Sequence, residues 1–97
     1  MVDEVIHQSM RLKIMSSLNV LGRNDWLDFA RLKSILDTTD GNLGAHLETL
    51  EKAGYITVEK RFEDRKPQTR VRMSPAGRRA FAEHVAYLRE IIDDAGA

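Results

Sequence analysis

Apolar residues in the first part of the chain recur every three or four positions, a spacing that places them on one face of a helix. The first set lies within residues 8–19 and comprises Met10, Ile14, Met15 and Leu18. It predicts a first helix, which Gly22 brings to an end. The second set follows Asp28 and comprises Phe29, Leu32, Ile35 and Leu36. It predicts a short second helix with these residues on one side. The Asp28 carboxylate can cap this helix by accepting hydrogen bonds from the free backbone amides of its first turn.

A third helix is predicted directly after the polar sequence DTTD, where Thr38 or Thr39 can act as the capping residue. Leucines at positions i, i+4 and i+7 give this helix one buried stripe, formed by Leu43, Leu47 and Leu50. Gly54 stands where a left-handed residue would close the helix after Ala53. Two helices joined by so short a turn form a helix-turn-helix.

The pattern then changes to alternation, which is the period of a β-strand with one buried face. In YITVEKRF the inward positions are Ile56 and Val58. In TRVRM they are Val71 and Met73. With RKPQ interrupting between them, the two stretches predict a hairpin over about residues 55–73. Trp26 and Leu27, ahead of the second helix, fit a further short strand.

Ser74-Pro75 opens a last helix over about residues 75–92, because the serine can cap it and proline suits the first helical position. Three helices, a hairpin and a helix are the order of a winged helix-turn-helix, a mainly α fold with a β-hairpin wing (α+β class). A chain of 97 residues without repeats or linkers suits a single domain over residues 1–97.

In this fold the third helix, about residues 40–53, enters the major groove of DNA, and the wing reaches along the backbone or into the minor groove.

Charge is distributed unevenly along a chain whose formal net charge is zero. Residues 1–59 carry six Lys/Arg and nine Asp/Glu (−3), residues 60–79 carry eight and two (+6), and residues 80–97 carry one and four (−3). The cations on the predicted hairpin are Lys60, Arg61, Arg65, Lys66, Arg70 and Arg72, and Arg78 and Arg79 follow it. A local basic arm can bind a polyanion by releasing counterions even when the whole protein is neutral. We therefore expect these hairpin cations to contact DNA, the alternative being a solvated charged face.

The face of the third helix opposite its leucine stripe begins with small residues. It is formed by Gly41, Ala45, Glu48 and Lys52, with Asn42 and Thr49 to one side. Gly41 and Gly44 each cost a helix about 1 kcal/mol relative to alanine. This cost is explained if the helix approaches base edges closely; the alternative is that Gly41 lies in a frayed first turn and Gly44 packs on a neighbouring helix. Because Asn42 can pair bidentately with adenine, we expect DNA contacts from Thr39, Asp40, Gly41, Asn42, Ala45 and Thr49.

The sequence holds no constellation typical of catalysis or metal binding. Cysteine is absent, and the three histidines, His7, His46 and His84, include no i, i+4 pair. We expect no enzyme activity, no metal and no cofactor, a structural hydrogen bond for His46, and a buried place beside the core for Trp26. No apolar run approaches the roughly 20 residues of a membrane span, and the first residues do not resemble a signal peptide, so the cytoplasm is the expected compartment.

The segments TDGNLGAHLETLEKAGYITVEKRF and RKPQTRVRMSPAGRRAF resemble small winged-helix transcriptional regulators related to the MarR and ArsR families. The likeness spans about residues 8–92 and includes RLKIMSSL, AGYI and SPAG at the expected places. It implies a homodimeric DNA-binding repressor or activator with dimer contacts from the N-terminal and C-terminal helices. Gly44 stands where this family commonly has a serine whose hydroxyl could bind a phosphate, so that contact is missing here.

The last helix carries more apolar surface than one packing stripe requires. Phe81, Val85, Leu88 and Ile92 form the stripe, and Tyr87 and Ile91 lie beside it. A homodimer through these residues would present two recognition helices to half-sites about one helical turn apart. The alternative is one broad face packed entirely within the monomer.

The leading interpretation is a sequence-specific, double-stranded DNA-binding transcriptional regulator. The alternative is a winged-helix module for protein contacts, whose basic wing would dock an acidic partner. Because no separate sensing domain fits within this length, a small effector would have to use the dimer cleft.

Overall fold

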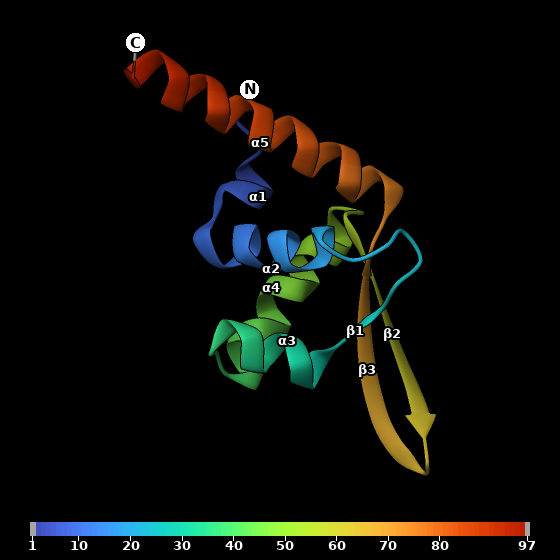
Figure 1. Ribbon diagram of the computed structural model, residues 1–97. Coiled ribbons are helices and arrows are strands. Elements are labelled where there is room, and N and C mark those ends of the chain that lie inside the picture. Colours follow the sequence, from blue (N-terminus) through green and yellow to red (C-terminus); the bar gives the residue numbers. More distant parts are fainter. Residues whose placement is uncertain (1, 97) are drawn as a thin grey trace.

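Helices and a small antiparallel sheet alternate in the computed structural model, which describes residues 2–96 (Figure 1). The helices are α1 (Glu4–His7), α2 (Ser9–Asn19), α3 (Phe29–Leu36), α4 (Asp40–Lys52) and α5 (Pro75–Gly96). The strands are β1 (Leu27–Asp28), β2 (Ile56–Glu63) and β3 (Lys66–Met73), in the sheet order β1-β3-β2. This arrangement confirms the predicted winged helix-turn-helix, with a wing of β2 and β3 and a C-terminal helix. None of the helices within residues 2–96 is long and apolar enough to cross a membrane.

The helix-turn-helix is formed by α3 and α4. Helix α3 ends at Asp37, which has a left-handed φ of 49° and whose N–H donates back to the carbonyls of the last turn. The Thr39 hydroxyl accepts from the Asn42 N–H at 3.2 Å, which confirms the predicted cap of α4. The predicted cap of α3 is wrong in its chemistry: Asp28 precedes the helix, but its side chain makes no capping hydrogen bond. Asp28 belongs also to β1, where it pairs with Arg70 of β3.

The leucine stripe of α4 lies at the centre of the core. Leu43, Leu47 and Leu50 are buried, as predicted, and Gly54 with φ of 80° follows the end of the helix. The other buried apolar residues come from every larger element and include Ile14, Met15, Leu18, Leu32, Ile56, Val71, Met73 and Phe81. Ile35 departs from the prediction, since it is 50% exposed although it was placed on the inner side of α3. The helix of eight residues buries only part of its apolar side against the sheet and α2.

The turn of the wing is tighter than the alternation predicts. It consists of Asp64 and Arg65, both with positive φ (51° and 66°), the conformation of a two-residue hairpin turn. The prediction that RKPQ interrupts the strands is therefore wrong, because β3 already starts at Lys66, opposite Glu63. Strand β1 pairs only with Arg70 and Val71 near the base of β3, so the edge of β3 at Pro67 has no neighbouring strand. Proline is tolerated there because no backbone N–H is required to donate across that edge.

The N-terminal helix α1 has no counterpart in the predicted elements. The Asp3 carboxylate caps it by accepting from the Val5 and Ile6 amides at 3.0 and 3.1 Å. Ile6 is completely buried in the core, so this four-residue helix closes the core beneath α5. Four residues are too few to show a helical period, which explains why the pattern did not reveal it.

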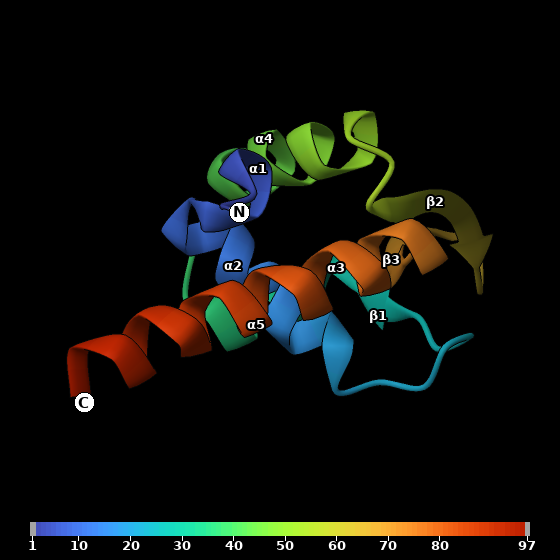
Figure 2. The same ribbon diagram turned by 90° about the horizontal axis from the view of Figure 1, so that it is seen from above.

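Helix α5 starts as predicted and runs further than predicted. The Ser74 hydroxyl accepts from the Gly77 N–H at 2.9 Å and donates to the Gly54 carbonyl at 2.6 Å. Gly77 is required here, because a Cβ at this position would lie 2.0 Å from the Tyr55 carbonyl oxygen. The helix continues to Gly96, four residues past the expected end, and its C-terminal turns project beyond the other helices (Figure 2).

Candidate nucleic-acid interface

The outward face of α4 is exposed, as the pattern predicts. Gly41, Asn42, Ala45, Glu48 and Lys52 are exposed. A Cβ added at Gly41 or Gly44 would meet no atom within 4 Å, so the alternative that Gly44 packs against a neighbouring helix is wrong. The two glycines therefore leave an open, narrow surface along the first turns of this helix.

The polar residues around this surface are held by short contacts. The Asn42 amide nitrogen donates to the Thr38 hydroxyl at 2.8 Å, which orients the side chain and leaves its carbonyl oxygen and second amide hydrogen available. The Thr49 hydroxyl donates to the Ala45 carbonyl within α4 at 3.2 Å. Asp40 is paired with Lys33 of α3 at 2.8 Å, so part of its negative charge is balanced. Of the residues predicted on α4, Asn42 is thus the one best placed to read a base edge.

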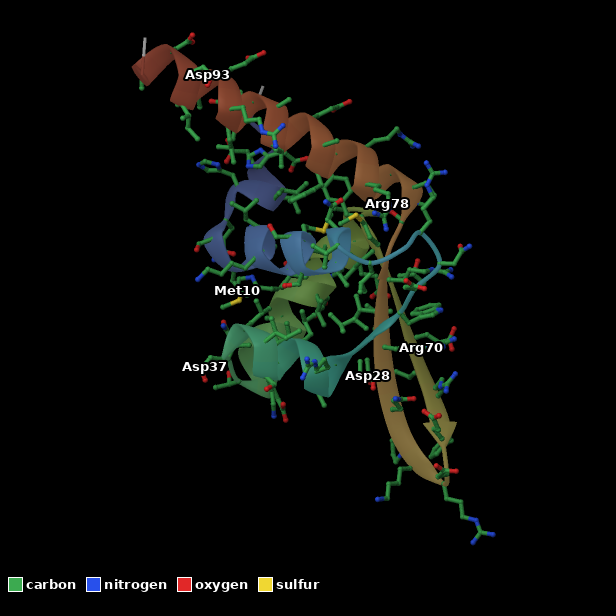
Figure 3. All side chains as sticks on the ribbon, in the orientation of Figure 1. Met10, Asp28, Asp37, Arg70, Arg78 and Asp93 are labelled. Atoms are coloured by element: carbon green, nitrogen blue, oxygen red, sulfur yellow. The ribbon has the colours of Figure 1, made fainter. Side chains whose placement is uncertain are left out.

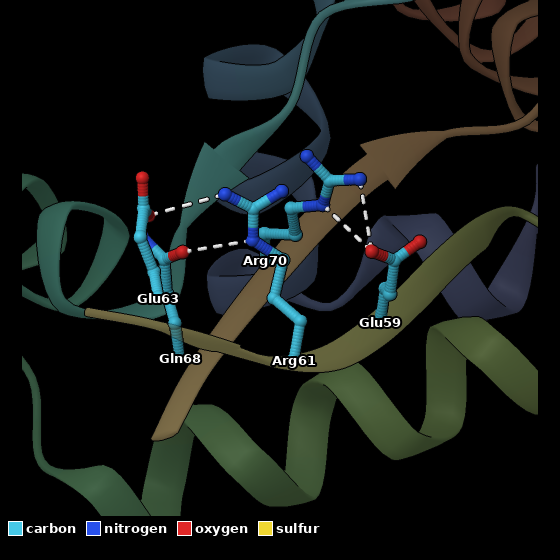
Figure 4. Close-up of polar contacts among 5 residues, drawn as sticks. All are labelled: Glu59, Arg61, Glu63, Gln68 and Arg70. Carbon is cyan, nitrogen blue, oxygen red and sulfur yellow. Dashed lines mark hydrogen bonds and ion pairs between the residues drawn. The ribbon is translucent and has the colours of Figure 1, made fainter. Parts of the chain in front are cut away.

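The six predicted wing cations do not share one face. Ile56 and Val71 face the core, and side chains alternate along each strand, so Lys60 lies on the core-facing side of β2. Arg61 of β2 and Arg70 of β3 project from the opposite side (Figure 4), and the strand register places Arg72 there as well. The period that placed the apolar residues inward already implied this division.

Two of the arginines on the outer face are paired with acids of the same sheet (Figure 4). Arg70 Nη2 lies 2.8 Å from Glu59 Oε1, and Arg61 Nη2 lies 3.1 Å from Glu63 Oε2. Arg61 also donates to Gln68 Oε1 at 3.1 Å. Their charge is therefore partly balanced within the wing. The Arg70–Glu59 pair depends on the strand register, whereas Arg61 and Glu63 belong to the same strand.

Trp26 lies against the arginines of this face. The guanidinium carbons of Arg70 and Arg72 lie 4.1 and 4.3 Å from its ring centroid, the geometry of cation–π contacts. The prediction that Trp26 fills a place beside the core is therefore wrong. The indole stiffens the base of the wing by fixing two arginine side chains on β3.

The cations best placed for a polyanion lie toward the end of the wing. Lys60, Arg65 and Lys66 are exposed and form no ion pair with another described residue. Figure 1 shows the wing tip and the start of α4 on the side of the molecule away from α5. The structure thus brings the wing tip and the open end of α4 to the same side of the molecule. Lys66 shares the outer face of the wing with Arg61, Arg70 and Arg72, whereas Lys60 lies on the core-facing side.

The histidines have structural surroundings. Arg11 Nη1 donates to His46 Nδ1 at 3.2 Å, which confirms the structural hydrogen bond expected for His46. Burial, with Arg11 nearby, lowers the pKa of His46. His84 is buried beneath α1, where Nδ1 accepts from the Asp3 N–H at 3.4 Å and Nε2 has no partner among the described residues. Burial and the neighbouring His7 lower the pKa of His84.

The apolar surface predicted on α5 divides into two parts. Phe81 is buried in the core of its own chain, so its assignment to a dimer interface is wrong, and Val85 packs against the same core. Ile91 and Ile92 are 47% and 66% exposed, and Tyr87 and Leu88 are half-buried beside them. The surface left for a second chain is therefore confined to the last turns of the helix.

The fold is that of a winged-helix protein. Residues 10–92 match the family of winged helix DNA-binding domains, and the chain belongs to that family. A transcriptional regulator homologue from Pyrococcus horikoshii OT3 is 27% identical, with a TM-score of 0.88 over 98% of this chain and 91% of that chain. An uncharacterized protein of Methanocaldococcus jannaschii is 30% identical over 82 residues, or 84% of this chain and 86% of that protein. FabT of Streptococcus pneumoniae, solved in complex with DNA, shares the fold at 19% identity, with a TM-score of 0.61 over 95% of this chain and 66% of that chain.

These likenesses confirm the resemblance to small winged-helix transcriptional regulators. Family and fold are those of DNA-binding transcriptional regulators and not those of enzymes.

Proposed function

We propose that this chain regulates transcription by binding a specific double-stranded DNA site as a homodimer. In the proposed complex the open face of α4 enters the major groove, and the wing tip lies on the backbone or in the adjacent minor groove. The observation that carries the proposal is the open surface at Gly41, Gly44 and Ala45, which no described part of the chain covers. Small residues there allow the helix backbone to approach base edges.

Base reading is assigned to Asn42 within this surface. Its orientation by Thr38 leaves one acceptor and one donor free, the pair that a bidentate contact with adenine requires. Thr39 and Thr49 flank it, and the pairing of Asp40 with Lys33 reduces the repulsion that a carboxylate would meet near phosphates. Gly41 and Ala45 contribute by their small size.

Phosphate binding is assigned mainly to Lys60, Arg65 and Lys66. They are exposed on the outer half of the wing, and each phosphate contact they make would release a counterion. Arg61, Arg70 and Arg72 contribute less directly, because they are held by Glu59, Glu63 and Trp26. The DNA complex of FabT, which has this fold, supports duplex DNA as the ligand.

The homodimer is assigned to the last turns of α5. Tyr87, Leu88, Ile91 and Ile92 form an apolar surface on a part of the helix that projects from the rest of the molecule (Figure 2). A second copy of the chain could cover this surface, and two copies would present two α4 helices to one duplex.

The proposal is tested by separating the two kinds of contact. We expect Arg65→Ala with Lys66→Ala to weaken binding to all duplexes and to lower the slope of log affinity against log salt by roughly two per chain, or about four for the homodimer, since each lost phosphate contact removes about 0.9. We expect Asn42→Ala to reduce the discrimination between sites by about 1–3 kcal/mol while leaving the salt slope unchanged. Fluorescence anisotropy with a panel of duplexes at several salt concentrations measures both.

A matched control is Lys13→Ala with Arg89→Ala, which also removes two exposed cations but from α2 and α5. This control should bind DNA as the parent does. If the wing and Asn42 variants bound every duplex as tightly as the parent, the assignment of this surface to DNA would be wrong. Retention of one acidic protein from a lysate, with no duplex bound at low salt, would favour the protein-contact alternative.

A further inference from the structure

A pocket of about 520 Å³ lies at the base of the wing, between the start of α5 and the loop that leads from α2 to β1. It is lined by Arg23, Asn24, Thr57, Arg72, Met73, Ser74, Pro75, Arg78, Arg79 and Ala82. Four of these residues are arginines, and no Asp or Glu is among them. We call this feature the arginine pocket; the predicted DNA contacts include only one of its residues, Arg72.

The guanidinium groups of the arginine pocket are not balanced by nearby acids. None of the four arginines forms an ion pair within the described part of the chain. Arg78 donates instead to the carbonyl oxygens of Asn19, Leu21 and Gly22 at 3.4–3.5 Å, so it keeps its full charge while its side chain is fixed. Arg72 is similarly fixed against the Trp26 ring.

The backbone adds to this positive character. Helix α5 is 22 residues long, and its N-terminal end, which carries the positive end of the helix dipole, forms part of the pocket wall. Arg23 and Arg79 are exposed and make no hydrogen bond or ion pair with other described residues, so both can turn toward a bound group. Two fixed and two adjustable cations thus surround one concave site.

The arginine pocket does not face the proposed DNA surface. Thr57 and Arg72 lie on the side of the sheet opposite the core-facing residues, whereas α4 packs on the core-facing side. Figure 3 shows Arg78 next to the start of α5, far from Asp37, which directly precedes the helix-turn-helix loop at the other side of the molecule. A duplex lying across the start of α4 and the wing tip leaves this pocket available to a different ligand.

We propose that the arginine pocket binds a small, multiply charged anion of the phosphate or carboxylate class. Planar guanidinium groups suit the paired oxygens of both classes, and several of them together favour a ligand with more than one negative charge. The volume exceeds that needed for a single water-sized ion, which also points to a small molecule. The site does not depend on the proposed DNA function, because Arg72 is its only residue among the predicted DNA contacts and the other nine lie outside them.

The test uses the full chain and two probes, inorganic pyrophosphate and citrate, in isothermal titration calorimetry at constant ionic strength. We expect one site per chain for at least one probe. Arg23→Gln with Arg79→Gln should weaken that binding by at least about tenfold, because two charge-assisted contacts are lost. Arg31→Gln, an exposed arginine on α3 outside the pocket, should leave it unchanged. Thermal unfolding without probe should be the same for all three proteins, since none of the substituted residues is buried.

A second arm distinguishes a free anion from a DNA phosphate. The double variant should bind duplex DNA as the parent does, and saturating duplex should not displace the probe. Absence of heat with both probes, equal affinity of the parent and the double variant, or displacement of the probe by duplex would each overturn the assignment. Displacement would show that the pocket holds a backbone phosphate of DNA instead of a small molecule.

Discussion

His84 shows how one buried residue couples the N-terminal segment to α5. Its ring is 1% exposed, it accepts from the Asp3 N–H, and the rings of His7 and Tyr87 lie 5.6 and 6.2 Å away. Asp3 in turn accepts from the Tyr55 hydroxyl at 2.6 Å, and this hydrogen bond raises the pKa of Tyr55 to about 12. The N-terminal segment is therefore joined by polar contacts to the middle of α5 and to Tyr55, which directly precedes β2.

The lowered pKa of His84 predicts a pH dependence of stability. The unfolded chain takes up a proton near the ordinary pKa of 6.5, whereas the folded chain resists it until a lower pH. The unfolding free energy should therefore fall as pH drops below about 6.5 and level off below the folded pKa of His84. His46, whose pKa is also lowered, should act in the same direction.

Urea unfolding between about pH 8 and pH 5 measures this dependence. His84→Gln keeps a polar side chain that does not titrate, so the variant should lose less stability across this range than the parent does. His46→Gln serves as the comparison for the second histidine. An unchanged pH profile in His84→Gln would contradict the account of this residue.

At single positions, local chemistry was predictable and tertiary contacts were not. The caps by Thr39 and Ser74 follow from short-range rules and are confirmed. The place of Trp26 under two arginines depends on the pairing of β1 with β3, which no local pattern shows. Gly77 appeared only as part of a family motif, and its reason, the contact with the Tyr55 carbonyl, belongs to the folded chain.

Among the elements, α4 has a buried leucine stripe on one side and glycines near the start of the other, and these glycines lower the stability of the helix. Open space at Gly41 and Gly44 means that alanine fits at both positions. We expect Gly41→Ala with Gly44→Ala to raise the unfolding free energy by up to about 1 kcal/mol per site, less in the first turn. If the face approaches base edges, the same substitutions should weaken binding to the preferred DNA site.

Thermal unfolding and duplex titrations of the same samples measure the two effects. Gly96→Ala is the matched control, because its Cβ would also meet no atom within 4 Å but it lies at the end of α5. It should not change DNA affinity. Glycine variants of α4 that bind DNA as tightly as the parent would show that close approach is not the reason for these glycines.

Helices and strands with a clear period of apolar residues could be predicted from the sequence. Elements whose conformation depends on contacts with the rest of the fold could not. The three leucines of α4 and the alternation of β2 and β3 were sufficient for the winged helix. The short α1 and the turn at Asp64 and Arg65 gave no such signal, since neither glycine nor asparagine marks the positive φ values. The division of the wing cations between two faces followed from the alternation alone, whereas the ion pair between Glu59 and Arg70 required the strand register.

For the whole molecule, the proposed homodimer depends on the projecting end of α5. We expect Ile91→Asp with Ile92→Asp to convert a dimeric parent into a monomer, because charged groups would replace the apolar surface proposed to be covered. Light scattering after size-exclusion chromatography measures the mass. Glu90→Gln with Asp93→Asn changes exposed polar residues of the same turns and should leave the dimer intact.

A parent protein that is monomeric at high concentration would contradict the proposed dimer. A double aspartate variant that remained dimeric would instead place the interface elsewhere. The Glu90→Gln, Asp93→Asn variant should unfold at the parent's temperature, since these side chains are exposed. The double aspartate variant should unfold at a lower temperature than a dimeric parent, because it lacks the stabilisation that dimerisation provides.

In vitro selection of duplexes bound by the parent protein, followed by sequencing, tests the central claim most directly. The account predicts an enriched inverted repeat with half-sites about one helical turn apart, and a loss of preference at one position of each half-site in Asn42→Ala. Selected duplexes with no common sequence, or a consensus unchanged by Asn42→Ala, would contradict it.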